Sequence, residues 1–353
     1  MSKIAILGDL HWGARSDSLQ VIEYFNKFFS NVFFPELYRR NIKHIIQCGD
    51  LVDRRKFINI NTAHELHKNF TDPIIEREIQ LDIILGNHDT FYKGTNSVNS
   101  FNILFKNAPD NIQVYCNPEE RIVAPQTDFL FLPWICEDNE KESFDLIKKS
   151  NAKYVIGHLE LAEFEMYKGH MADEGIDRNL FSKFHRVFTG HYHTRSIREN
   201  IQYIGTPYEI VWSDFNDPRG FYILDTETDI VEFVENPHSL FHKISFDDNV
   251  IDVKNFPYEY YRNTYVKVII LNNKKPWLMD EFLTNFNKVE TIDLQVIDGS
   301  IVIDTDVEVN IEEVEDTFSI LNNYVDKIEL PDKQKLKSEL INLYLEAVQI
   351  SKE

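Results

Sequence analysis

Cysteine is scarce in this sequence, with three residues among 353. Cys48, Cys116 and Cys136 form no Cys-x-x-Cys pair, which argues against a structural zinc site with thiolate ligands. So few cysteines are typical of a protein from a reducing compartment, where disulfides do not persist.

Long apolar runs are also missing, because no stretch approaches the roughly 20 residues of a membrane-spanning helix. The first residues, MSKIAILGDLHWG, run directly into a strand-like segment with candidate functional side chains. We therefore expect no cleavable signal peptide, no association with a membrane, and a cytoplasmic location.

Positive charge is in short supply, since 37 Lys and Arg stand against 58 Asp and Glu, a net charge of −21. This balance disfavours a protein that holds nucleic acid through its overall electrostatic field. One local exception is the basic run Arg54-Arg55-Lys56, which we expect to form a DNA-binding edge.

Glycine is uncommon, but five of the twelve glycines follow a short apolar segment and precede a side chain that can bind metal. The five places are Gly8-Asp9-Leu10-His11, Gly49-Asp50-Leu51-Val52-Asp53, Gly86-Asn87-His88-Asp89, Gly157-His158-Leu159-Glu160 and Gly190-His191-Tyr192-His193. Glycine permits a tight turn and a close approach of backbone to ligand.

The apolar segments before these turns are rich in β-branched and aromatic residues and predict strands. They are Ile4–Leu7, His44–Cys48, Leu81–Leu85, Tyr154–Ile156 and Val187–Phe188. Because helical patterns alternate with them, we expect an α/β domain in which they share a sheet covered on both sides. The carboxyl ends of such strands border one crevice, so seven side chains should converge there. These are Asp9, His11, Asp50, Asn87, His158, His191 and His193.

Carboxylate, imidazole and amide ligands together suit Mn²⁺, Fe²⁺ or Zn²⁺ better than Ca²⁺. Seven ligands exceed the need of one ion, so a binuclear site is expected, with Asp50 as the bridge. Two such ions can activate water and stabilise the entering and leaving oxygens of a phosphoester displacement. His88 is predicted to face the substrate as a proton donor or charge stabiliser, with Asp89 placed to orient it.

The other predicted elements fill the intervals between the turns. Ser16 or Ser18 should cap a helix that runs to Phe33, and Pro73 should divide a helical region from Asn61 to Gln80. Further helices are predicted over Asn96–Lys106 and Asp138–Ser150, with strands over Asn111–Pro133 and Gln202–Thr226. A second copy of the chain is expected to bind to the helices near residues 60–70 and 96–106, where Phe101, Leu104 and Phe105 offer an apolar face.

Three domains are predicted, over residues 1–240, 241–305 and 306–353. The second reads as a small α/β addition with strands Tyr265–Leu271, Asp293–Ile297 and Ile301–Ile303 and a helix Met279–Asn287. The third has apolar residues at helical spacing on either side of Pro331, which predicts two amphipathic helices. They either fold back on the small domain or bind an apolar partner surface through Phe318, Leu321, Leu336, Leu340 and Leu343.

The ordered set of glycine turns resembles the calcineurin-like metallophosphoesterase superfamily over roughly residues 1 to 230. The whole chain is similar to a narrower family, the SbcD-type nuclease subunits of double-strand-break repair and phage recombination. This resemblance rests on Gly8-Asp9-Leu10-His11-Trp12-Gly13, Leu132-Pro133-Trp134, Tyr203-Ile204-Gly205-Thr206-Pro207 and Asn216-Asp217-Pro218-Arg219-Gly220-Phe221.

The resemblance implies a β-sandwich flanked by helices, a capping domain that recognises DNA, and a C-terminal helix-loop-helix. It implies a homodimeric nuclease that cleaves double-stranded ends and single strands with two Mn²⁺ per chain, or with Mg²⁺ or another divalent ion. The partner would be an SbcC-type ABC ATPase with a coiled coil, in the host cytoplasm if the chain is encoded by a phage.

Carried over by motif, the resemblance places Asp9, His11, Asp50 and His193 around one ion. Asp50, Asn87, His158 and His191 surround the other, and His88 matches the catalytic histidine. Members often have a second histidine where this chain has Asp53, so Asp53 is expected to take a catalytic part by pairing with His88 or Arg54.

Two other functions are compatible with the superfamily motifs. A Ser/Thr protein phosphatase would carry Glu where this chain has Asp89. A phosphodiesterase for small nucleotides or lipid precursors would lack the last hundred residues. A binding module with an inactive site is disfavoured by the complete set of ligands.

Overall fold

The computed structural model describes residues 2–123, 127–167 and 170–298. They form two compact units, one up to Phe241 and one from His242 on. Within these described ranges, no helix has both the length and the apolar character needed to cross a membrane.

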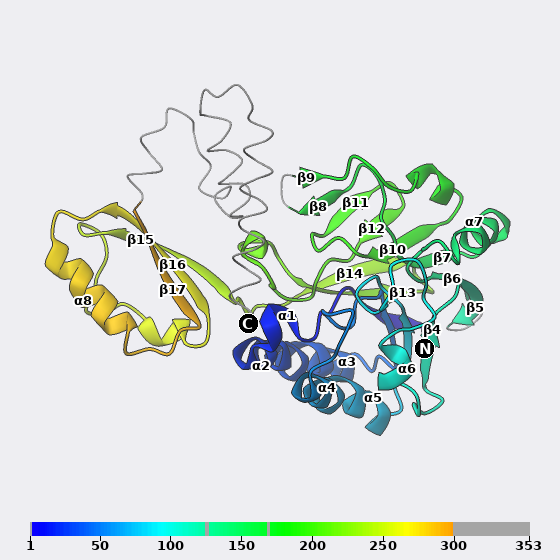
Figure 1. The fold of residues 1–353 in the computed structure, drawn as a ribbon, viewed down its shortest axis with the longest axis horizontal. Helices are drawn as coiled ribbons and strands as arrows, with labels where there is room; N and C mark the ends of the chain where they lie inside the picture. The colour runs from blue at the N-terminus through cyan, green and yellow to red at the C-terminus, as the bar shows by residue number, and fades with distance from the viewer. Residues whose placement is uncertain (1, 124–126, 168–169, 299–353) are drawn as a thin grey trace. The chain divides into compact units, whose positions relative to one another are not determined.

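The first unit is built on two six-stranded sheets (Figure 1). In the first sheet, the four strands β1 to β4 run parallel, each beside the next. On the other side of β1, β13 pairs antiparallel with it, and β14 pairs antiparallel with β13. Its strands in spatial order are β14 (Ile230–Glu235), β13 (Gly220–Asp225), β1 (Lys3–Leu7), β2 (His44–Gln47), β3 (Gln80–Ile84) and β4 (Ile112–Tyr115).

The second sheet has four parallel strands between two antiparallel edges. Its order is β11 (Ser196–Arg198), β12 (Ile201–Tyr203), β10 (Arg186–Gly190), β7 (Tyr154–His158), β6 (Thr127–Leu132) and β5 (Glu119–Val123). The five strands before the glycine turns are confirmed, but placing them in one sheet was wrong. Three belong to the first sheet and two to the second, since hydrophobic periodicity does not specify pairing.

The main core lies between the two sheets. Ile4 and Ile6 of β1 pack in one cluster with Phe129 and Phe131 of β6, and all four are fully buried. Tyr115 of β4 stacks on Phe131 across the interface, with ring centroids 4.1 Å apart and planes 3° from parallel. Alternate residues of each strand thus meet the opposite sheet, the arrangement of a β-sandwich.

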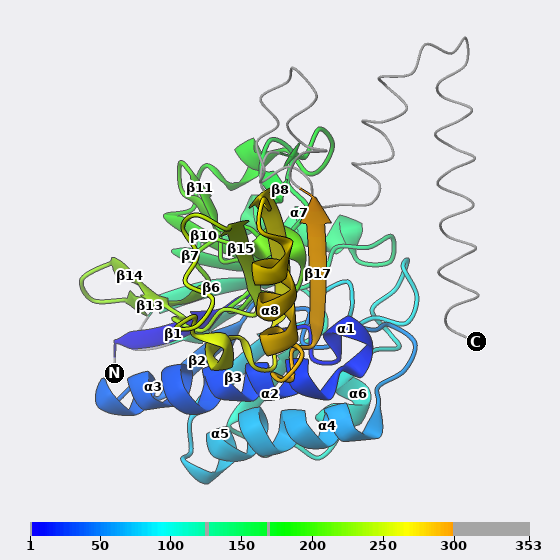
Figure 2. The ribbon, with the colours of Figure 1, turned by 90° about the vertical axis from the view of Figure 1, so that its left-hand side faces the viewer.

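Helices cover the outer side of the first sheet, as Figures 1 and 2 show. They are α2 (Leu19–Phe28), α3 (Phe34–Arg39), α4 (Ile60–Leu66) and α5 (Asp72–Glu76). Aromatic rings fill the space beneath them: Phe25 stacks on Tyr208 at 3.8 Å, and Trp12 stacks on Phe29 at 5.7 Å. Ser18 occupies the N-cap of α2, but its hydroxyl makes no capping bond and donates to Gln20 instead.

Two π-helical segments join these helices in pairs. Phe29–Phe33 lies between α2 and α3, and His67–Thr71 between α4 and α5. The residues at each junction keep right-handed helical dihedrals, so Pro73 does not divide its helix as predicted. Proline has no N–H to donate to the carbonyl four residues earlier, and its ring crowds the preceding helical turn. The wider π turn His67–Thr71 ahead of Pro73 accommodates the missing hydrogen bond and the ring.

The predicted helix over Asn96–Lys106 is confirmed only as α6 (Phe101–Leu104). Ahead of it, the Asn96 side chain donates to the carbonyl of Trp134 at 2.9 Å, and the Asn99 side chain donates to the carbonyl of Asn96 at 2.8 Å. Such side-chain bonds to backbone compete with helix formation. Phe101 and Phe105 are buried, so they belong to the core and not to a surface face.

The outer side of the second sheet is covered by α7 (Glu140–Lys149), the hairpin of β8 (Glu165–Tyr167) and β9 (His170–Met171), and a short helix η3 (Arg178–Phe181). Ile147 of α7 and Phe181 pack with Val155 of β7 in a second apolar cluster. The predicted helix Asp138–Ser150 is confirmed as α7.

The second unit has a three-stranded sheet of β15 (Phe241–Asp247), β16 (Tyr265–Asn272) and β17 (Asp293–Asp298). Two helices accompany it, η5 (Tyr258–Tyr261) and α8 (Pro276–Phe286), whose Phe282 and Phe286 pack with Phe246 and Val268. The strands predicted at Tyr265 and Asp293 and the helix near Met279 are confirmed. The predicted strand Ile301–Ile303 and the domain over residues 306–353 lie outside the described residues.

Candidate metal centre

The ends of five strands, three from one sheet and two from the other, meet at one place in the first unit. Asp9, Asp50 and Asn87 follow β1, β2 and β3, whereas His158 is the last residue of β7 and His191 follows β10. His11 and His193 lie two residues beyond Asp9 and His191. All seven residues predicted as ligands therefore lie at or just beyond the strand ends at this junction.

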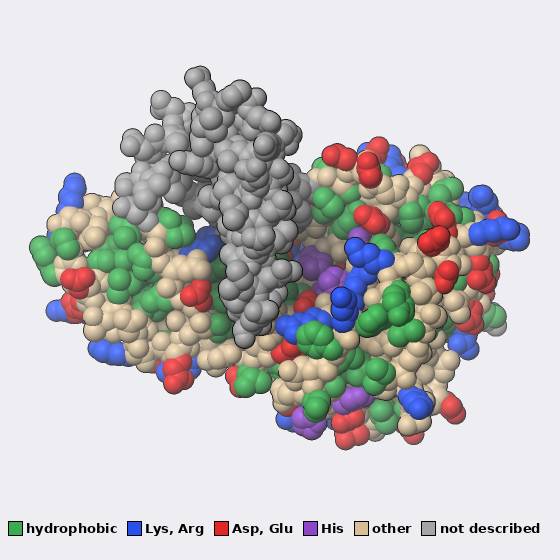
Figure 3. Space-filling view, in the orientation of Figure 1, with side chains coloured by type: hydrophobic (Ala, Val, Ile, Leu, Met, Phe, Trp, Pro, Cys, Tyr) green, Lys and Arg blue, Asp and Glu red, His purple; other side chains and the backbone are tan. Residues whose placement is uncertain are grey.

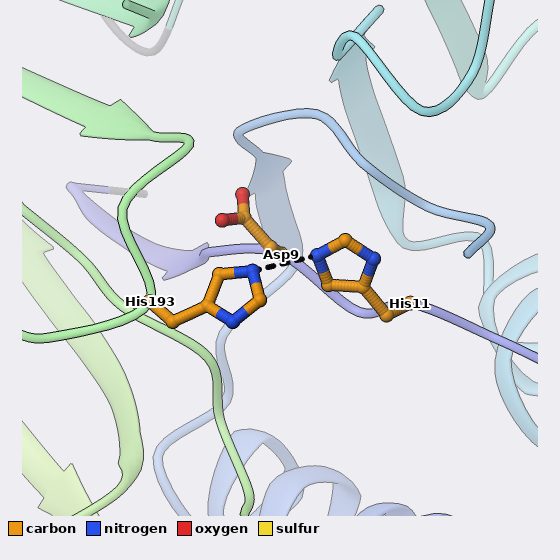
Figure 4. Close-up of side chains that lie close together, drawn as sticks. All are labelled: Asp9, His11 and His193. Carbon is orange, nitrogen blue, oxygen red and sulfur yellow. Dashed lines mark hydrogen bonds between the residues drawn. The ribbon is translucent and has the colours of Figure 1, made fainter. Parts of the chain in front are cut away.

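One group of these side chains consists of Asp9, His11 and His193 (Figure 4). The two imidazoles approach through their Nε2 atoms, which are 3.0 Å apart. One ligand atom from each of the three residues lies within 4.8 Å of the others. Asp9 is fully buried, His11 is 2% exposed and His193 is partly exposed.

A second group surrounds the side-chain oxygen of Asn87. His158 Nε2 is 2.9 Å from Asn87 Oδ1, and His191 Nδ1 is 3.0 Å from the same atom. Asp50 lies between the two groups, because its Oδ2 is 3.4 Å from His158 Nε2 and 3.8 Å from His11 Nε2.

These spacings fit divalent metal ions. Ligands about 2.0–2.2 Å from one ion, at right-angled or tetrahedral geometry, are separated from each other by roughly 3 Å. The nearest pairs here are separated by 2.9–3.0 Å. The donor set of carboxylate, imidazole and amide, with no thiolate, suits Mn²⁺, Fe²⁺ or Zn²⁺.

Three of the seven candidate ligands have left-handed backbone conformations. The φ angles are 45° at His11, 53° at Asp50 and 92° at His191. Residues with a Cβ are rarely found there, and such strain concentrates at functional sites. No sequence pattern indicated these conformations, because none of the three residues is glycine.

Two glycines allow the ligands to pack closely. A Cβ on Gly86 would lie 2.2 Å from Asp50 Oδ1, and one on Gly190 would lie 2.3 Å from Asp9 Oδ1. Both distances are far below van der Waals contact. The requirement for glycine at these turns is therefore steric, as the sequence pattern predicted.

Backbone groups fix the orientation of the imidazoles. His158 Nδ1 lies 2.8 Å from the carbonyl oxygen of Cys48 and donates to it, which leaves Nε2 facing Asn87 and Asp50. The backbone N–H of His191 donates to Asp9 Oδ2 at 3.0 Å. Such second contacts set the tautomer and direction of a ligating histidine.

The buried carboxylates control the electrostatics of the site. Burial raises the pKa of Asp9 to about 7, although His158 opposes the shift. Burial would also raise the pKa of Asp50, but His158 and His11 outweigh it and hold that pKa below its usual range.

The histidines respond in opposite directions. Burial alone would lower the pKa of His158, but Asp50 raises it to about 9. Burial and the neighbouring His158 lower the pKa of His191 to about 3. Asp50 and burial thus shift the pKa values of His158 and His191 in opposite directions, and the low pKa of His191 favours the neutral form that can ligate a metal.

His88 lies beside the ligands, with its backbone N–H donating to Asp50 Oδ1 at 2.7 Å. Its Nδ1 lies 2.5 Å from the backbone carbonyl oxygen of Asp53. Burial lowers the pKa of His88. The contact with Asp53 runs through the backbone, whereas the Asp53 carboxylate lies 3.5 Å from His11 Nδ1. A carboxylate oxygen of Asp53 also lies within 4.8 Å of a ring nitrogen of His88, so the expected pairing of Asp53 with His88 stays a prediction and His11 is a further neighbour.

Asp89 does not orient His88 as predicted. Its carboxylate accepts from the backbone N–H groups of Gly86 at 2.9 Å, Val52 at 3.2 Å and Leu51 at 3.3 Å. Asp89 is 1% exposed, and burial raises its pKa to about 7. It joins the turns after β2 and β3 and so sets the spacing of Asp50 and Asn87.

Arg219 is a positioning residue that the sequence did not single out, although it falls in the Asp217-Pro218-Arg219-Gly220 turn. Its Nη1 donates to the carbonyl oxygen of His193 and to Thr206 Oγ1, and its Nη2 is 2.9 Å from Asp214 Oδ1. The side chain is 3% exposed. It anchors the turn that carries His193.

The three residues of the basic run Arg54-Arg55-Lys56 differ in their contacts and in their exposure. Arg54 is engaged, with Nη1 3.1 Å from Asp17 Oδ2 and its guanidinium 4.9 Å from the centre of the Phe57 ring. Arg55 has a buried Nη1 without a hydrogen-bond partner among the described residues, and Lys56 is exposed. Figure 3 shows Lys and Arg side chains next to the exposed histidines on this face of the first unit.

Residues 2–195 match the calcineurin-like phosphoesterase family model. The chain belongs to this family. The matched region contains all seven candidate ligands, and binding of divalent metal is a property of the family that the clustered ligand groups fit.

Two relatives extend the comparison. Exonuclease subunit 1 of Enterobacteria phage T4 is 32% identical over 370 aligned residues, which cover 98% of this chain and 100% of the phage protein. The SbcD component of the nuclease SbcCD from Staphylococcus saprophyticus is 24% identical over 209 residues, covering 51% of this chain and 54% of that protein. A solved archaeal phosphodiesterase aligns with 66% of this chain and 99% of its own at 14% identity, with a TM-score of 0.34.

Proposed function

We propose that this chain is the nuclease subunit of an SbcCD-type complex and hydrolyses phosphodiester bonds at DNA ends with two Mn²⁺ ions. The convergence of seven candidate ligands from the strand ends of two sheets is the observation that carries the proposal. The near full-length similarity to a phage exonuclease subunit supports DNA as the substrate.

Asp9, His11 and His193 would hold one ion, and Asn87, His158 and His191 the other, with Asp50 shared. The position of Asp50 Oδ2 between His11 and His158 supports the shared role. Two divalent ions in this place would supply an activated water and stabilise charge on the reacting oxygens. The task of the protein is to hold the ligands rigidly, which Asp89 and Arg219 do through the backbone.

His88 would act on the leaving oxygen. Its Nδ1 is committed to the Asp53 carbonyl, so the other ring nitrogen is the one available to substrate. Protonated at that nitrogen, His88 would donate to the leaving oxygen or stabilise its charge. Since burial lowers the pKa of His88, the anionic phosphate must favour the protonated form on binding. Asp53 would act indirectly, through its contact with His11.

Arg55 and Lys56 would contact the phosphate backbone of the DNA. Arg55 is partly exposed and Lys56 is exposed, whereas Arg54 is held by Asp17. The net charge of −21 leaves little general attraction for DNA, so these local cations would need help from a partner.

We propose that an SbcC-type ABC ATPase is this partner. The amphipathic pattern of the tail, with Phe318, Leu321, Leu336, Leu340 and Leu343, would bind the base of its coiled coil. The complex would act in the cytoplasm. The protein name of the phage relative, which designates a subunit, agrees with an assembly of more than one chain.

We also propose a homodimer. Helices α4 and α6 lie side by side in Figures 1 and 2, and they expose Ile60 and Ile103, which are 88% and 77% accessible. These residues replace the buried Phe101 and Phe105 as the apolar surface available to a second copy.

The test is a parallel assay of three substrates with Mn²⁺: linear DNA, bis-p-nitrophenyl phosphate and a phosphoprotein. Nucleotide release from DNA, abolished by Asp50→Ala, is the expected result. Turnover of phosphoprotein in preference to DNA would instead identify a Ser/Thr-type phosphatase. Cleavage of the small diester without cleavage of DNA would identify a small-molecule phosphodiesterase.

A further inference from the structure

A recess opens beside the candidate metal centre within the first unit. Its volume is about 540 Å³, in the range of roughly 300–1,000 Å³ that is usual for small organic ligands. His158 lines it and belongs to the metal centre as well. Trp134 lies at the junction, with its ring 5.3 Å from that of His191 and 6.1 Å from that of His158.

The chemistry of this recess differs from that of the centre. Its apolar walls come from Trp134 and Ile135 after β6, Phe144 of α7, and Ile176. Glu137, Glu140 and Glu160 are exposed around it. The lining residues that the structure describes include no lysine or arginine, so the recess does not suit a phosphate group. It suits a flat, uncharged ring that carries hydrogen-bond donors at its edge.

We propose that this recess is a base pocket, formed by Trp134, Ile135, Phe144 and Ile176, for a nucleobase next to the scissile phosphodiester. The proposal deepens the nuclease function and rests on it. The base stacks on the indole of Trp134, because every nucleobase has a π face that an aromatic side chain can cover. The shared wall of His158 places that base beside the phosphodiester held at the metal centre.

The acidic rim gives the pocket a preference among bases. Glu137, Glu140 and Glu160 offer carboxylate oxygens, which accept hydrogen bonds and do not donate them. Adenine, cytosine and guanine have exocyclic amino groups that can donate to them, whereas thymine has none. A thymine at this position is therefore the least favoured.

The pocket also requires an unpaired nucleotide. A base inside a duplex is stacked and paired, and it reaches a protein pocket only after it leaves the stack. Frayed ends and single strands meet this requirement at the lowest cost. The pocket thus predicts faster cleavage of a mismatched terminus than of a paired terminus with the same base.

Single-stranded oligonucleotides with an abasic residue on either side of the cleaved bond test the proposal. Wild-type protein should cleave the intact strand about 5- to 100-fold more efficiently than one of the abasic strands. Trp134→Leu and Phe144→Ala should bring this ratio close to one, and Trp134→Phe should retain most of it. Trp277→Leu, at a 63% exposed tryptophan of the second unit, is the matched control and should leave the ratio unchanged. Equal cleavage of intact and abasic strands by wild-type protein would overturn the proposal.

A binding measurement separates the pocket from the nuclease function. Deoxyadenosine, but not deoxyribose, should quench tryptophan fluorescence in the wild-type and Trp277→Leu proteins and not in Trp134→Leu. Quenching without any cleavage of DNA would support base binding in the pocket and refute the nuclease function. Cleavage of DNA without quenching and without base dependence would refute the pocket alone.

Discussion

The Nε2 atoms of His11 and His193 lie 3.0 Å apart, although 182 residues separate the two histidines in the chain. His11 is buried and His193 is partly exposed, and the pKa of His193 lies well below its usual range because of desolvation and the neighbouring His11. A neutral His193 presents a lone pair toward the place where His11 and Asp9 converge. This relationship is the geometric basis for the metal predictions.

Titration calorimetry with Mn²⁺ should give two ions per wild-type chain. Asp50→Ala removes the shared carboxylate and should weaken binding at least about 100-fold, since even outer contacts of metal ligands are worth 10- to 100-fold. His88→Ala should retain both ions and lose about 100- to 10,000-fold in kcat. His64→Ala, at an exposed histidine, is the control and should change neither. A single ion at saturating Mn²⁺ would contradict the two-metal mechanism.

Arg55→Gln should weaken DNA binding and lower the slope of log Kd against log salt by about one, because one phosphate contact is lost. Arg54→Gln is the matched control: its guanidinium is held by Asp17, so the salt slope should stay the same. Fluorescence anisotropy over a KCl series measures both. If the Arg54 variant changed the slope and the Arg55 variant did not, the assignment would be reversed.

The free energy of unfolding should depend on pH through the carboxylate of Asp229. Its carboxylate accepts from the Tyr154 hydroxyl at 2.5 Å and from His185, so it links the β13–β14 turn of the first sheet to the second sheet. Burial would raise the pKa of Asp229, but these hydrogen bonds outweigh it and lower the pKa to about 2 from the usual 3.8. The ionised carboxylate therefore stabilises the fold at pH values above 3.8. This contribution disappears as the pH falls through the pKa of Asp229 in the folded protein, about 2.

Asp229→Asn should cost about 1 to 2 kcal/mol near neutral pH and progressively less as pH approaches 2. Thermal unfolding at a series of pH values measures the difference from wild type. Asp110→Asn, at an exposed position, serves as the control and should show no such trend. A constant difference across the series would show that the linkage does not depend on the charge of Asp229.

Light scattering should give a particle of twice the 41.7 kDa of one chain. Ile60→Glu with Ile103→Glu places charge on the exposed apolar surface of α4 and α6 and should yield monomers, because burying those carboxylates in an interface is unfavourable. Ile230→Glu, at a 63% exposed residue of β14, should remain dimeric. A wild-type protein that stayed monomeric with and without DNA would refute this interface.

Leu336→Glu with Leu343→Glu should abolish co-purification with the SbcC-type ATPase and leave cleavage of bis-p-nitrophenyl phosphate intact. The same charge at polar positions of the predicted helix, in Gln334→Glu with Asn342→Glu, should leave the complex formed. If the leucine double variant still formed the complex, the tail would not be the docking element.

Glycine-ended apolar segments predicted the five strands and the positions of the seven candidate ligands, because strand ends in an α/β protein bring side chains to a shared edge. Division of these strands between two sheets could not be predicted, since inward and outward residues alternate in the same way in either arrangement. Pairing depends on contacts between distant segments, such as Leu130 of β6 with Val155 of β7.

The supporting residues of the site were predicted less well. Asp89 and Arg219 act through backbone groups that any residue could provide, so no residue pattern indicates their partners. Likewise, the left-handed turns at His11 and Asp50 are imposed by surrounding structure and not by local preference. The shortening of α6 was recognisable in principle, because Asn96 and Asn99 are residues that compete for backbone hydrogen bonds.

The family match ends at residue 195, but the strand that carries Asp9 pairs on its other side with β13, at Gly220–Asp225. A fragment that stopped at the end of the match would leave β1 as an open sheet edge, prone to pairing with other chains. It would also lose Arg219 and with it the anchor of the His193 carbonyl. The smallest independent piece that keeps the site is therefore set by the hairpin of β13 and β14, well past the last candidate ligand.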